Sequence, residues 1–393
     1  MTNNYFNYNK YSKFLFLNFL LLFLSLSLTG CYDKVELEER GLVLSMGIDK
    51  NLENNNFLIT LSMPDIITST SSNSNPEDSS SGSSSINQAI KIGEASTISQ
   101  AINSINIDMI KNLYFGHTKV VLIGEEILKD EALLKQTIDF LERHREISRK
   151  VIILGTQNAK TILEAVPNDE KMLGIYINDF YKNNSSYKID LDYVIQKLLT
   201  SGDIAIPSIS LSENNLYINN LYIIKNYMLT SMLDENSSKY LLCVLDENTL
   251  NNSLTEISID FNNINTGLVF LNSSINKTIS QDLESNKIII NYNISSDVNI
   301  TEYSLGENIL FDDNSNYFKL LEQQAEQFLC EQIKSSINQI WDLNADILDL
   351  KQYIYKNNFS LYNQYNLDNS NIYDNILLEV SCNINIKGSG KIK

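Results

Sequence analysis

The residue with the clearest chemistry in this chain is Cys31, which follows Leu28–Gly30 at the end of an N-terminal apolar run. Lys10 and Lys13 precede that run, and this order of basic, apolar and small residues is typical of a bacterial signal peptide with a lipobox. The thiol would take a diacylglyceryl group before cleavage. We therefore expect residues 1–30 to be removed and Cys31 to become a lipidated first residue. Two acyl chains, at about 0.8 kcal/mol per buried methylene, hold a protein firmly at a membrane.

Two other interpretations of the apolar run remain open. As a helix, Phe14–Leu28 would rise at about 1.5 Å per residue and fall short of the roughly 30 Å hydrocarbon core, which disfavours a permanent transmembrane span. A plain signal peptide with an incidental cysteine is the second alternative. No further apolar run of transmembrane length follows Cys31 in the sequence.

The charge of the chain is strongly negative. The sequence contains 30 lysine and arginine residues against 48 aspartate and glutamate residues, a net charge of −18 at pH 7. Removal of Lys10 and Lys13 with the signal peptide lowers the net charge to −20. Because phosphate backbones bind to basic faces, we expect no nucleic acid partner. An anionic membrane surface would also repel the body, so attachment must come from the lipid and from specific partners.

Three cysteines remain once Cys31 is assigned to the lipid: Cys243, Cys330 and Cys382. Their wide spacing forms neither a disulfide framework nor a CxxC metal pattern. Each is consistent with a small buried apolar residue. A single long-range disulfide also stays open, because a protein outside the cytoplasm can keep one.

Few residues in the chain could do acid–base or metal chemistry. His117 and His144 are its two histidines, and neither lies in an HExxH pattern. P-loop, GxGxxG and GxSxG motifs are absent from the sequence. The acidic residues are numerous, but no two of them stand out as a glycosidase pair. We therefore predict no catalytic residue, no metal ligand and no cofactor.

The pattern of apolar residues predicts alternating strands and helices. Strands are expected at 42–49, 57–62, 119–123 and 150–154, with helices beginning at Thr97 and Asn158 and a further helical face at Leu134, Ile138 and Leu141. Between residues 69 and 85 the chain is almost entirely Ser, Asn and Thr, which predicts a surface loop. Near Gly202, a natural helix C-cap, we place a domain boundary.

We expect an α+β protein of three consecutive mixed α/β domains, each a small sheet packed with helices. The predicted domains are residues 31–200 with the Ser/Asn-rich loop 69–85, the strand-rich residues 201–300, and residues 301–393. The last contains a long helix at 317–341, with an apolar stripe of Leu321, Phe328, Ile333, Ile337 and Ile340, and a terminal strand at 376–386.

Several separated segments together form a recognisable pattern. They are Gly30–Asp33, Gly47–Asp49, Phe115–Val121, Gly124–Glu126, Asp139–Arg143 and Leu154–Leu163, followed by Gly202–Pro207, Leu221–Leu233, Leu320–Trp341 and Asp346–Leu348. This pattern resembles the C-subunit lipoproteins of spore germinant receptors, the Ger(x)C family. The chain departs from that family in three places. Tyr32 stands where the family commonly has Trp, and Asp349 and Leu350 stand where it often has glycine. The Pro and Trp residues usual near the end of the family's sequences are missing.

The resemblance implies a lipoprotein, carrying a diacylglyceryl group and palmitate at Cys31, on the outer face of the inner spore membrane. It also implies three α+β domains and a non-enzymatic role beside the A-type and B-type membrane subunits of a nutrient germinant receptor. The family-motif positions are expected to be structural rather than catalytic: Asp33, Gly47, Asp49, Gly116, His117 and Gly124.

Two other classes of protein remain as alternatives. A lipid-anchored solute-binding protein of a transporter would need two similar α/β lobes around a cleft, and the sequence shows no duplicated lobe. An envelope hydrolase would need two carboxylates converging in a deep cleft. The germinant, any direct contact with it, and the surface that meets the partners do not follow from the sequence.

Overall fold

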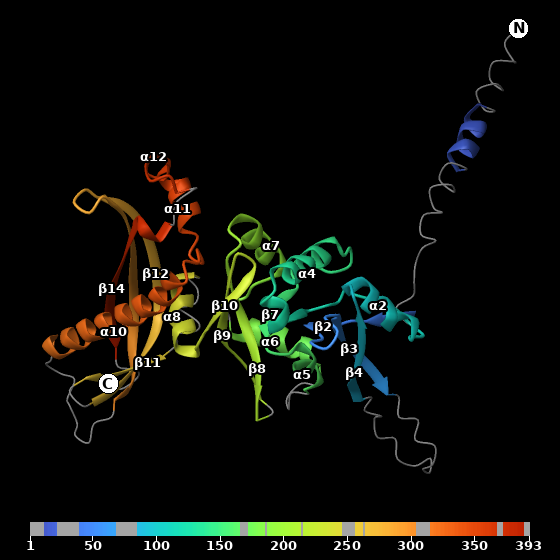
Figure 1. Ribbon diagram of the computed structural model, residues 1–393, viewed down its shortest axis with the longest axis horizontal. Coiled ribbons are helices and arrows are strands. Elements are labelled where there is room, and N and C mark those ends of the chain that lie inside the picture. The colour runs from blue at the N-terminus through green and yellow to red at the C-terminus, as the bar shows by residue number, and fades with distance from the viewer. Residues whose placement is uncertain are drawn as a thin grey trace, which may run out of the picture. The chain divides into compact units, whose positions relative to one another are not determined.

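The computed structural model describes residues 12–21, 39–67, 85–165, 172–184, 187–213, 215–245, 256–261, 264–303, 315–367 and 372–388 (Figure 1). Its contacts divide the chain into two units, one of residues 1–41 and 110–112 and one of residues 42–109 and 113–393. Cys31, Asp33 and the Ser/Asn-rich segment up to residue 84 lie outside the described residues. In the first unit, residues 12–21 are helical. Among the described helices, none is both long and apolar enough to cross a bilayer.

The larger unit contains an eight-stranded mixed sheet with the order β10-β9-β8-β7-β6-β2-β3-β4. Its strands are β2 (Ser45–Lys50), β3 (Phe57–Ile67), β4 (Ser85–Ala95), β6 (Val120–Gly124), β7 (Ile152–Thr156), β8 (Ile204–Ser212), β9 (Asn215–Lys225) and β10 (Met228–Leu233). The central strands β2, β6, β7 and β8 run parallel, and the outer pairs are antiparallel. Every residue of β6 and β7 is buried, as expected for parallel strands covered on both faces. Two short strands, β1 (Arg40–Leu42) and β5 (Asn112–Tyr114), pair separately.

Helices cover both faces of this sheet. They are α2 (Ile98–Ile107), α3 (Glu125–Leu128), α4 (Glu131–Arg143), α5 (Ala159–Glu164), α6 (Leu173–Asn184) and α7 (Leu191–Thr200). Along β6, Val121 and Ile123 join the core that includes α2, α4 and α7, whereas Val120 and Leu122 join the core that includes α5 and α6. Successive side chains of the strand point to opposite faces of the sheet and therefore pack into two separate hydrophobic layers.

Local signals for helix ends are confirmed. The Thr97 hydroxyl accepts a hydrogen bond from the Gln100 N–H at 3.3 Å, and the Asn158 side chain accepts one from the Thr161 N–H at 2.8 Å. After α7, Gly202 has a φ of 76°, and its N–H donates to the carbonyl of Leu198 at 3.1 Å. These caps satisfy backbone groups that a helix end leaves open.

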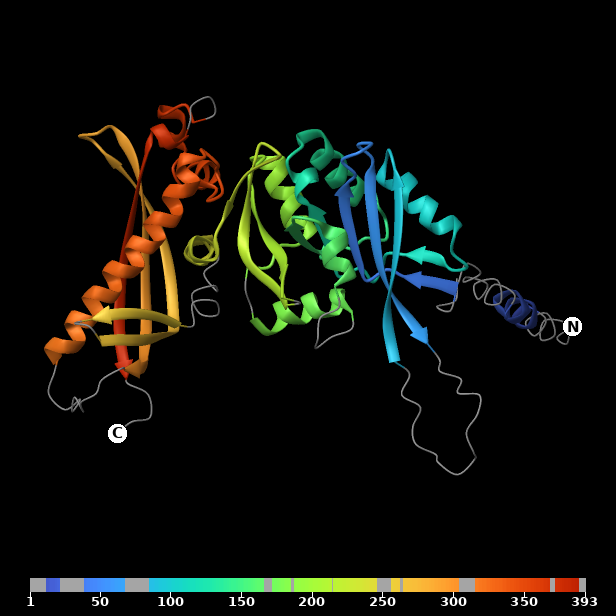
Figure 2. The same cartoon turned by 60° about the horizontal axis from the view of Figure 1, so that its bottom comes forward.

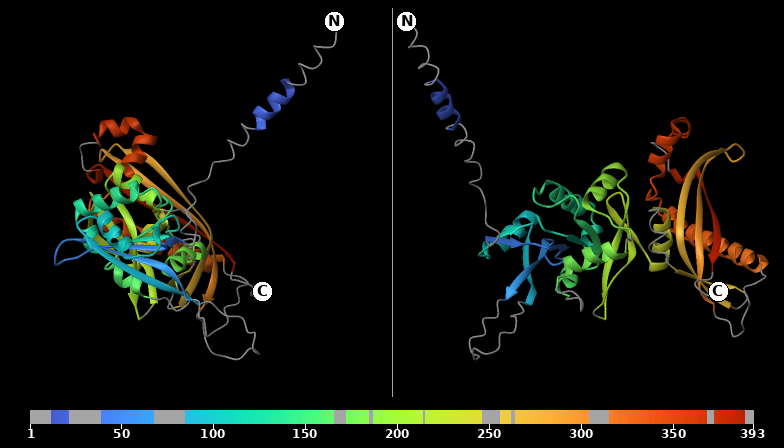
Figure 3. Two further views of the ribbon diagram at one scale, coloured as in Figure 1. Left: turned by 90° about the vertical axis from the view of Figure 1, so that its right-hand side faces the viewer. Right: turned by 180° about the vertical axis from the view of Figure 1, so that it is seen from behind.

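A second sheet has four strands in the order β11-β12-β13-β14: β11 (Glu256–Phe261), β12 (Ile264–Asp282), β13 (Lys287–Tyr303) and β14 (Ile376–Gly388). The long strands β12 and β13 run side by side to their hairpin turn (Figure 3, right panel). The pair β13 and β14 is parallel, although residues 304–375 separate them in the chain. The helices of this part of the chain are α8 (Glu235–Leu245), which packs on α10 and on β9, then α10 (Ser315–Asp342), α11 (Leu350–Asn357), α12 (Phe359–Gln364) and a 3-10 helix (Ile372–Asp374).

The helix α10 and the strand β14 confirm the predicted long helix and terminal strand, and Figure 2 shows α10 lying across the sheet. Its buried stripe differs from the predicted one at one position. Leu329 is fully buried and Phe328 only partly, because the stripe continues in steps of four residues from Leu321 through Ala325 to Leu329. A step of four keeps successive side chains on one helix face.

The expected α+β class is confirmed, and both sheets are packed with helices. The division into three domains stays a prediction. The described strands within residues 201–300 do not form a separate sheet. β8, β9 and β10 extend the first sheet, and β11, β12 and β13 belong to the second. Of the predicted loop 69–85, Ser85 already begins β4.

Candidate functional site

Three of the motif residues from the sequence meet at the carboxyl ends of the parallel strands. Gly47 and Asp49 lie on β2, Gly124 ends the neighbouring strand β6, and the N-terminus of α5 faces them. Asp49 is only 4 % exposed. Its Oδ1 accepts a hydrogen bond from the Ala159 N–H at 2.8 Å, and its Oδ2 accepts one from the Lys160 N–H at 2.9 Å. The carboxylate thus satisfies the first two N–H groups of α5, where the helix dipole favours a negative charge.

The two glycines make room for this arrangement. A Cβ at Gly124 would lie 2.2 Å from Asp49 Oδ1, and a Cβ at Gly47 would lie 2.8 Å from Leu163 Cδ1 and 2.9 Å from Ala159 Cβ. Neither position has space for a larger residue without displacing the carboxylate or α5. Gly47, Asp49 and Gly124 therefore form one packing unit that fastens α5 to the sheet.

The chemistry available to Asp49 is limited by its partners. Burial raises the pKa of Asp49, and the two backbone hydrogen bonds oppose that shift. Both carboxylate oxygens are engaged by the backbone of α5, so the group is a helix anchor rather than a general base. Within the described ranges, no three His, Cys, Asp or Glu side chains gather closely enough to hold a metal ion.

Gly116 and His117 lie at the opposite end of β6. His117 is exposed, and its ring meets the Tyr114 ring edge-on at 5.7 Å between centroids. A Cβ at Gly116 would lie 2.4 Å from Tyr114 Oη, so the glycine lets that tyrosine lie across the turn. The next residue, Thr118, donates its hydroxyl to the Val43 carbonyl at 3.1 Å. The structure thus separates this pair from the Asp49 unit instead of joining them in one site.

The other histidine, His144, is packed among aromatic rings. Its ring centroid lies 4.9 Å from that of Phe115 and 5.4 Å from that of Phe140. Burial lowers the pKa of His144, and Glu146 opposes the shift. The half-buried ring fills space between α4 and the segment that precedes β6.

Two further buried carboxylates, Asp203 and Asp346, were not singled out from the sequence, although both lie in segments that carry the family resemblance. Asp203 accepts hydrogen bonds from the N–H groups of Asn226 at 2.9 Å and Asp346 at 2.7 Å. Asp346 in turn accepts from the N–H groups of Leu350 at 2.7 Å and Lys351 at 3.1 Å, the first two of α11. Asp346 thus caps the N-terminus of α11 as Asp49 caps the N-terminus of α5. Burial raises the pKa of both Asp203 and Asp346.

Beside α11 a cavity of about 280 Å³ is lined by cationic and aromatic side chains. Lys277 donates to the Leu348 carbonyl at 3.3 Å and lies 4.2 Å from the centre of the Tyr353 ring. Burial lowers the pKa of Lys277 to about 8. Lys197 forms an ion pair with Asp349. Both lysines therefore already have partners within the chain, and these contacts hold the lining of the cavity against α11.

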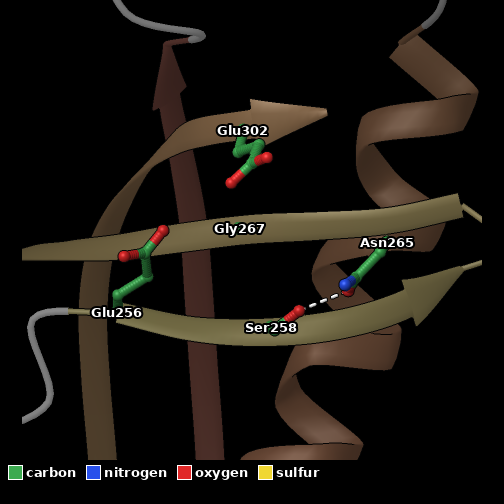
Figure 4. A pocket seen from close by; sticks show the side chains of 5 residues that line it. All are labelled: Glu256, Ser258, Asn265, Gly267 and Glu302. Carbon is green, nitrogen blue, oxygen red and sulfur yellow. Dashed lines mark hydrogen bonds between the residues drawn. The ribbon is translucent and has the colours of Figure 1, made fainter. Parts of the chain in front are cut away.

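Another hollow, of about 380 Å³, lies on the second sheet (Figure 4). Glu256 of β11 and Glu302 of β13 flank Gly267 on the intervening strand β12. Glu256 Oε1 accepts the Thr301 hydroxyl at 2.8 Å, and Ser258 bonds to Asn265. Both contacts join side chains of neighbouring segments of the second sheet and so hold the lining of the hollow together.

These features define an α+β protein whose buried carboxylates anchor helices to two sheets. Residues 33–211 match the family described as "Spore germination protein N-terminal domain", and residues 219–390 match "Spore germination B3/ GerAC like, C-terminal". The chain belongs to this family of spore germination proteins. The family resemblance predicted from the sequence is confirmed.

A curated relative and a solved structure agree with this assignment. The chain is 28% identical over 161 residues to "Spore germination protein KC" of Bacillus subtilis (strain 168); the match covers 40% of this chain and 38% of the relative, about two fifths of its length. The crystal structure of the GerBC protein matches with a TM-score of 0.56 and 13% sequence identity, covering 87% of this chain and 96% of that one. At that identity the likeness establishes the fold.

Proposed function

We propose that this protein is a lipid-anchored, non-enzymatic subunit of a spore nutrient germinant receptor. It would support the assembly or signalling of a complex with A-type and B-type membrane subunits on the outer face of the inner spore membrane. The observation that carries the proposal is the extent of the family match: it begins at residue 33, two residues after Cys31, and the two matched domains extend to residue 390.

The site geometry supports a structural rather than a catalytic role. The buried carboxylates of Asp49, Asp203 and Asp346 are each engaged by backbone N–H groups. Carboxylates occupied in this way organise helices and do not exchange protons with a substrate. The strongly negative charge of the chain, −18, supports attachment through lipid and partners rather than through anionic lipid headgroups.

Deletion of the gene in its endospore-forming host tests the receptor role. Spores that lack this chain should germinate poorly with nutrients, and complementation with the wild-type gene should restore the response. Normal nutrient germination of the deletion strain, in the absence of a redundant paralogue, would overturn the proposal.

Lipid anchoring is tested separately with Cys31→Ala. The variant should move from the membrane fraction to the soluble fraction and lose the acyl mass on its N-terminal peptide, because the thiol that carries the lipid is gone. Cys243→Ala is the matched control, since Cys243 lies in the interior, and it should fractionate as the wild type does. Unchanged membrane retention of Cys31→Ala would argue against a lipid anchor.

A further inference from the structure

The helix α10 runs along the edge strand of the second sheet in a regular pattern. β14 is the last strand in the order β11-β12-β13-β14, so its outer edge needs partners for its backbone groups. Glu322 Oε1 accepts the Ile386 N–H at 2.8 Å, and Glu326 Oε1 accepts the Ile384 N–H at 3.0 Å. Two successive glutamates of the helix therefore bond to two successive outward N–H groups of the strand.

The spacing of the two elements explains why this pattern continues. Four helix residues rise about 6.0 Å and two strand residues about 6.6 Å, so steps of four on α10 match steps of two on β14. The next step from Glu326 is Cys330, and the next step from Ile384 is Cys382. Their Sγ atoms lie 2.6 Å apart, and Cys330 also reaches the Val380 carbonyl at 3.5 Å. The contact between the sulfur atoms is thus set by the register of two rigid elements.

We propose that Cys330 and Cys382 form a disulfide bond that fastens α10 to the edge strand β14. The bond would close a loop across 52 residues of sequence separation. Such a link restricts the unfolded chain and holds the helix on the sheet. The remaining cysteine of the body, Cys243, is fully buried and donates its thiol to the Lys239 carbonyl at 3.2 Å, so it stays a thiol.

The bond forms by thiol–disulfide exchange with a protein or small-molecule disulfide, such as oxidised glutathione, as the oxidant. The Cys330 thiolate attacks one sulfur of the oxidant and releases its other half as a thiolate. The Cys382 thiolate then attacks Cys330 Sγ in the mixed disulfide and releases the second half. Two electrons pass to the oxidant, and the two protons of the cysteines end on its two thiols.

The surroundings of the two sulfurs favour this order of attack. Both side chains are partly exposed, so an oxidant can reach them. The hydrogen bond with Cys382 lowers the pKa of Cys330, with a further contribution from Lys334, and that same bond and burial raise the pKa of Cys382. Cys330 is therefore the thiol that starts the exchange, because the thiolate is the nucleophile.

Peptide mapping of the full chain tests the proposal. The purified protein, equilibrated with oxidised glutathione, is denatured, alkylated with N-ethylmaleimide and digested without reduction. We expect one linked peptide that contains Cys330 and Cys382, which disappears on reduction, while Cys243 is alkylated without prior reduction. Complete alkylation of Cys330 and Cys382 without reduction, or their capture only as separate glutathione adducts, would overturn the proposal.

Thermal unfolding gives a second measurement that does not depend on the digest. Reduction should lower the melting temperature of the wild type by about 5 °C. Cys330→Ser and Cys382→Ser should show the lower melting temperature already without reductant and no further response to it. Cys243→Ala serves as the matched control and should respond to reductant as the wild type does. A wild-type melting temperature that is independent of reductant would contradict the bond.

Discussion

The backbone N–H of Ala159 donates a 2.8 Å hydrogen bond to the buried carboxylate of Asp49, 110 residues earlier in the chain. With the second bond from Lys160, the side chain of a strand residue thus caps a helix of another segment. Asp346 caps α11 in the same manner. In both cases one buried acid replaces the water that would otherwise solvate a helix N-terminus.

Asp49→Ala should destabilise the protein by about 2–4 kcal/mol. The substitution leaves a buried N–H donor of Ala159 and a partly buried one of Lys160 without acceptors, and a buried group of this kind costs about 1–3 kcal/mol. Urea unfolding measures the change. Asp139→Ala is the matched control, because Asp139 is exposed and forms a surface ion pair with Arg143, so its loss should cost less than about 1 kcal/mol. Equal effects of the two substitutions would show that Asp49 is not an anchor.

Gly124→Ala should destabilise the protein because its Cβ would meet Asp49 Oδ1 at 2.2 Å. We expect a loss of about 1–3 kcal/mol in urea unfolding, as for other overpacked interiors. Gly388→Ala is the control, since among the described residues its Cβ would meet Asn299 Oδ1 at 3.6 Å, an ordinary contact distance, and it should be close to neutral.

A double-mutant cycle separates the Gly124 clash from general crowding. If Gly124→Ala acts through the Asp49 carboxylate, it should cost at least about 0.5 kcal/mol less in the Asp49→Ala background than in the wild type. Strict additivity of the two substitutions would place the clash elsewhere.

Glu326→Ala should expose the edge of β14. The Ile384 amide loses its acceptor, so its hydrogen exchange should become faster and the protein should lose about 1 kcal/mol of stability. Glu326→Gln keeps an acceptor oxygen and should preserve much of the protection. Glu331→Ala is the control on the same helix, because Glu331 is exposed and accepts a hydrogen bond from Gln327 of the same helix rather than from β14. Unchanged exchange at Ile384 in Glu326→Ala would refute the edge contact.

His144 should make stability depend on pH. Its folded-state pKa is lowered by burial, so the unfolded state binds the proton more readily. Stability is therefore fully present above the unfolded value of about 6.5 and is lost as the pH falls through it toward the folded value. His144→Phe should remove this loss, because the substituted ring does not titrate. Melting curves of both proteins, recorded from about pH 7.5 down to about pH 5.5 so that they span the ordinary histidine pKa, measure the direction of this dependence. A wild-type protein that gains stability relative to the variant on acidification would contradict the prediction.

The local elements were accessible from the sequence because their signals are local. Thr97 and Asn158 bond to N–H groups three residues away, so a cap can be recognised without knowledge of the fold. The apolar period of α10 and the alternation along β14 are likewise properties of adjacent residues. Phe328 was misplaced in the stripe because an apolar residue one position from Leu329 fits the same approximate period.

Other features depend on pairings between distant segments. That β8, β9 and β10 extend the first sheet follows from the contact of β7 with β8, at Gly155 and Ser208, which no local pattern encodes. The sequence by itself determined the class of fold and singled out the motif positions Gly47, Asp49 and Gly124, and it predicts a lipobox at Cys31. Only the tertiary structure decided that Asp49 caps α5 and that Cys330 meets Cys382, because a side chain acquires its function from neighbours that folding brings from far along the chain.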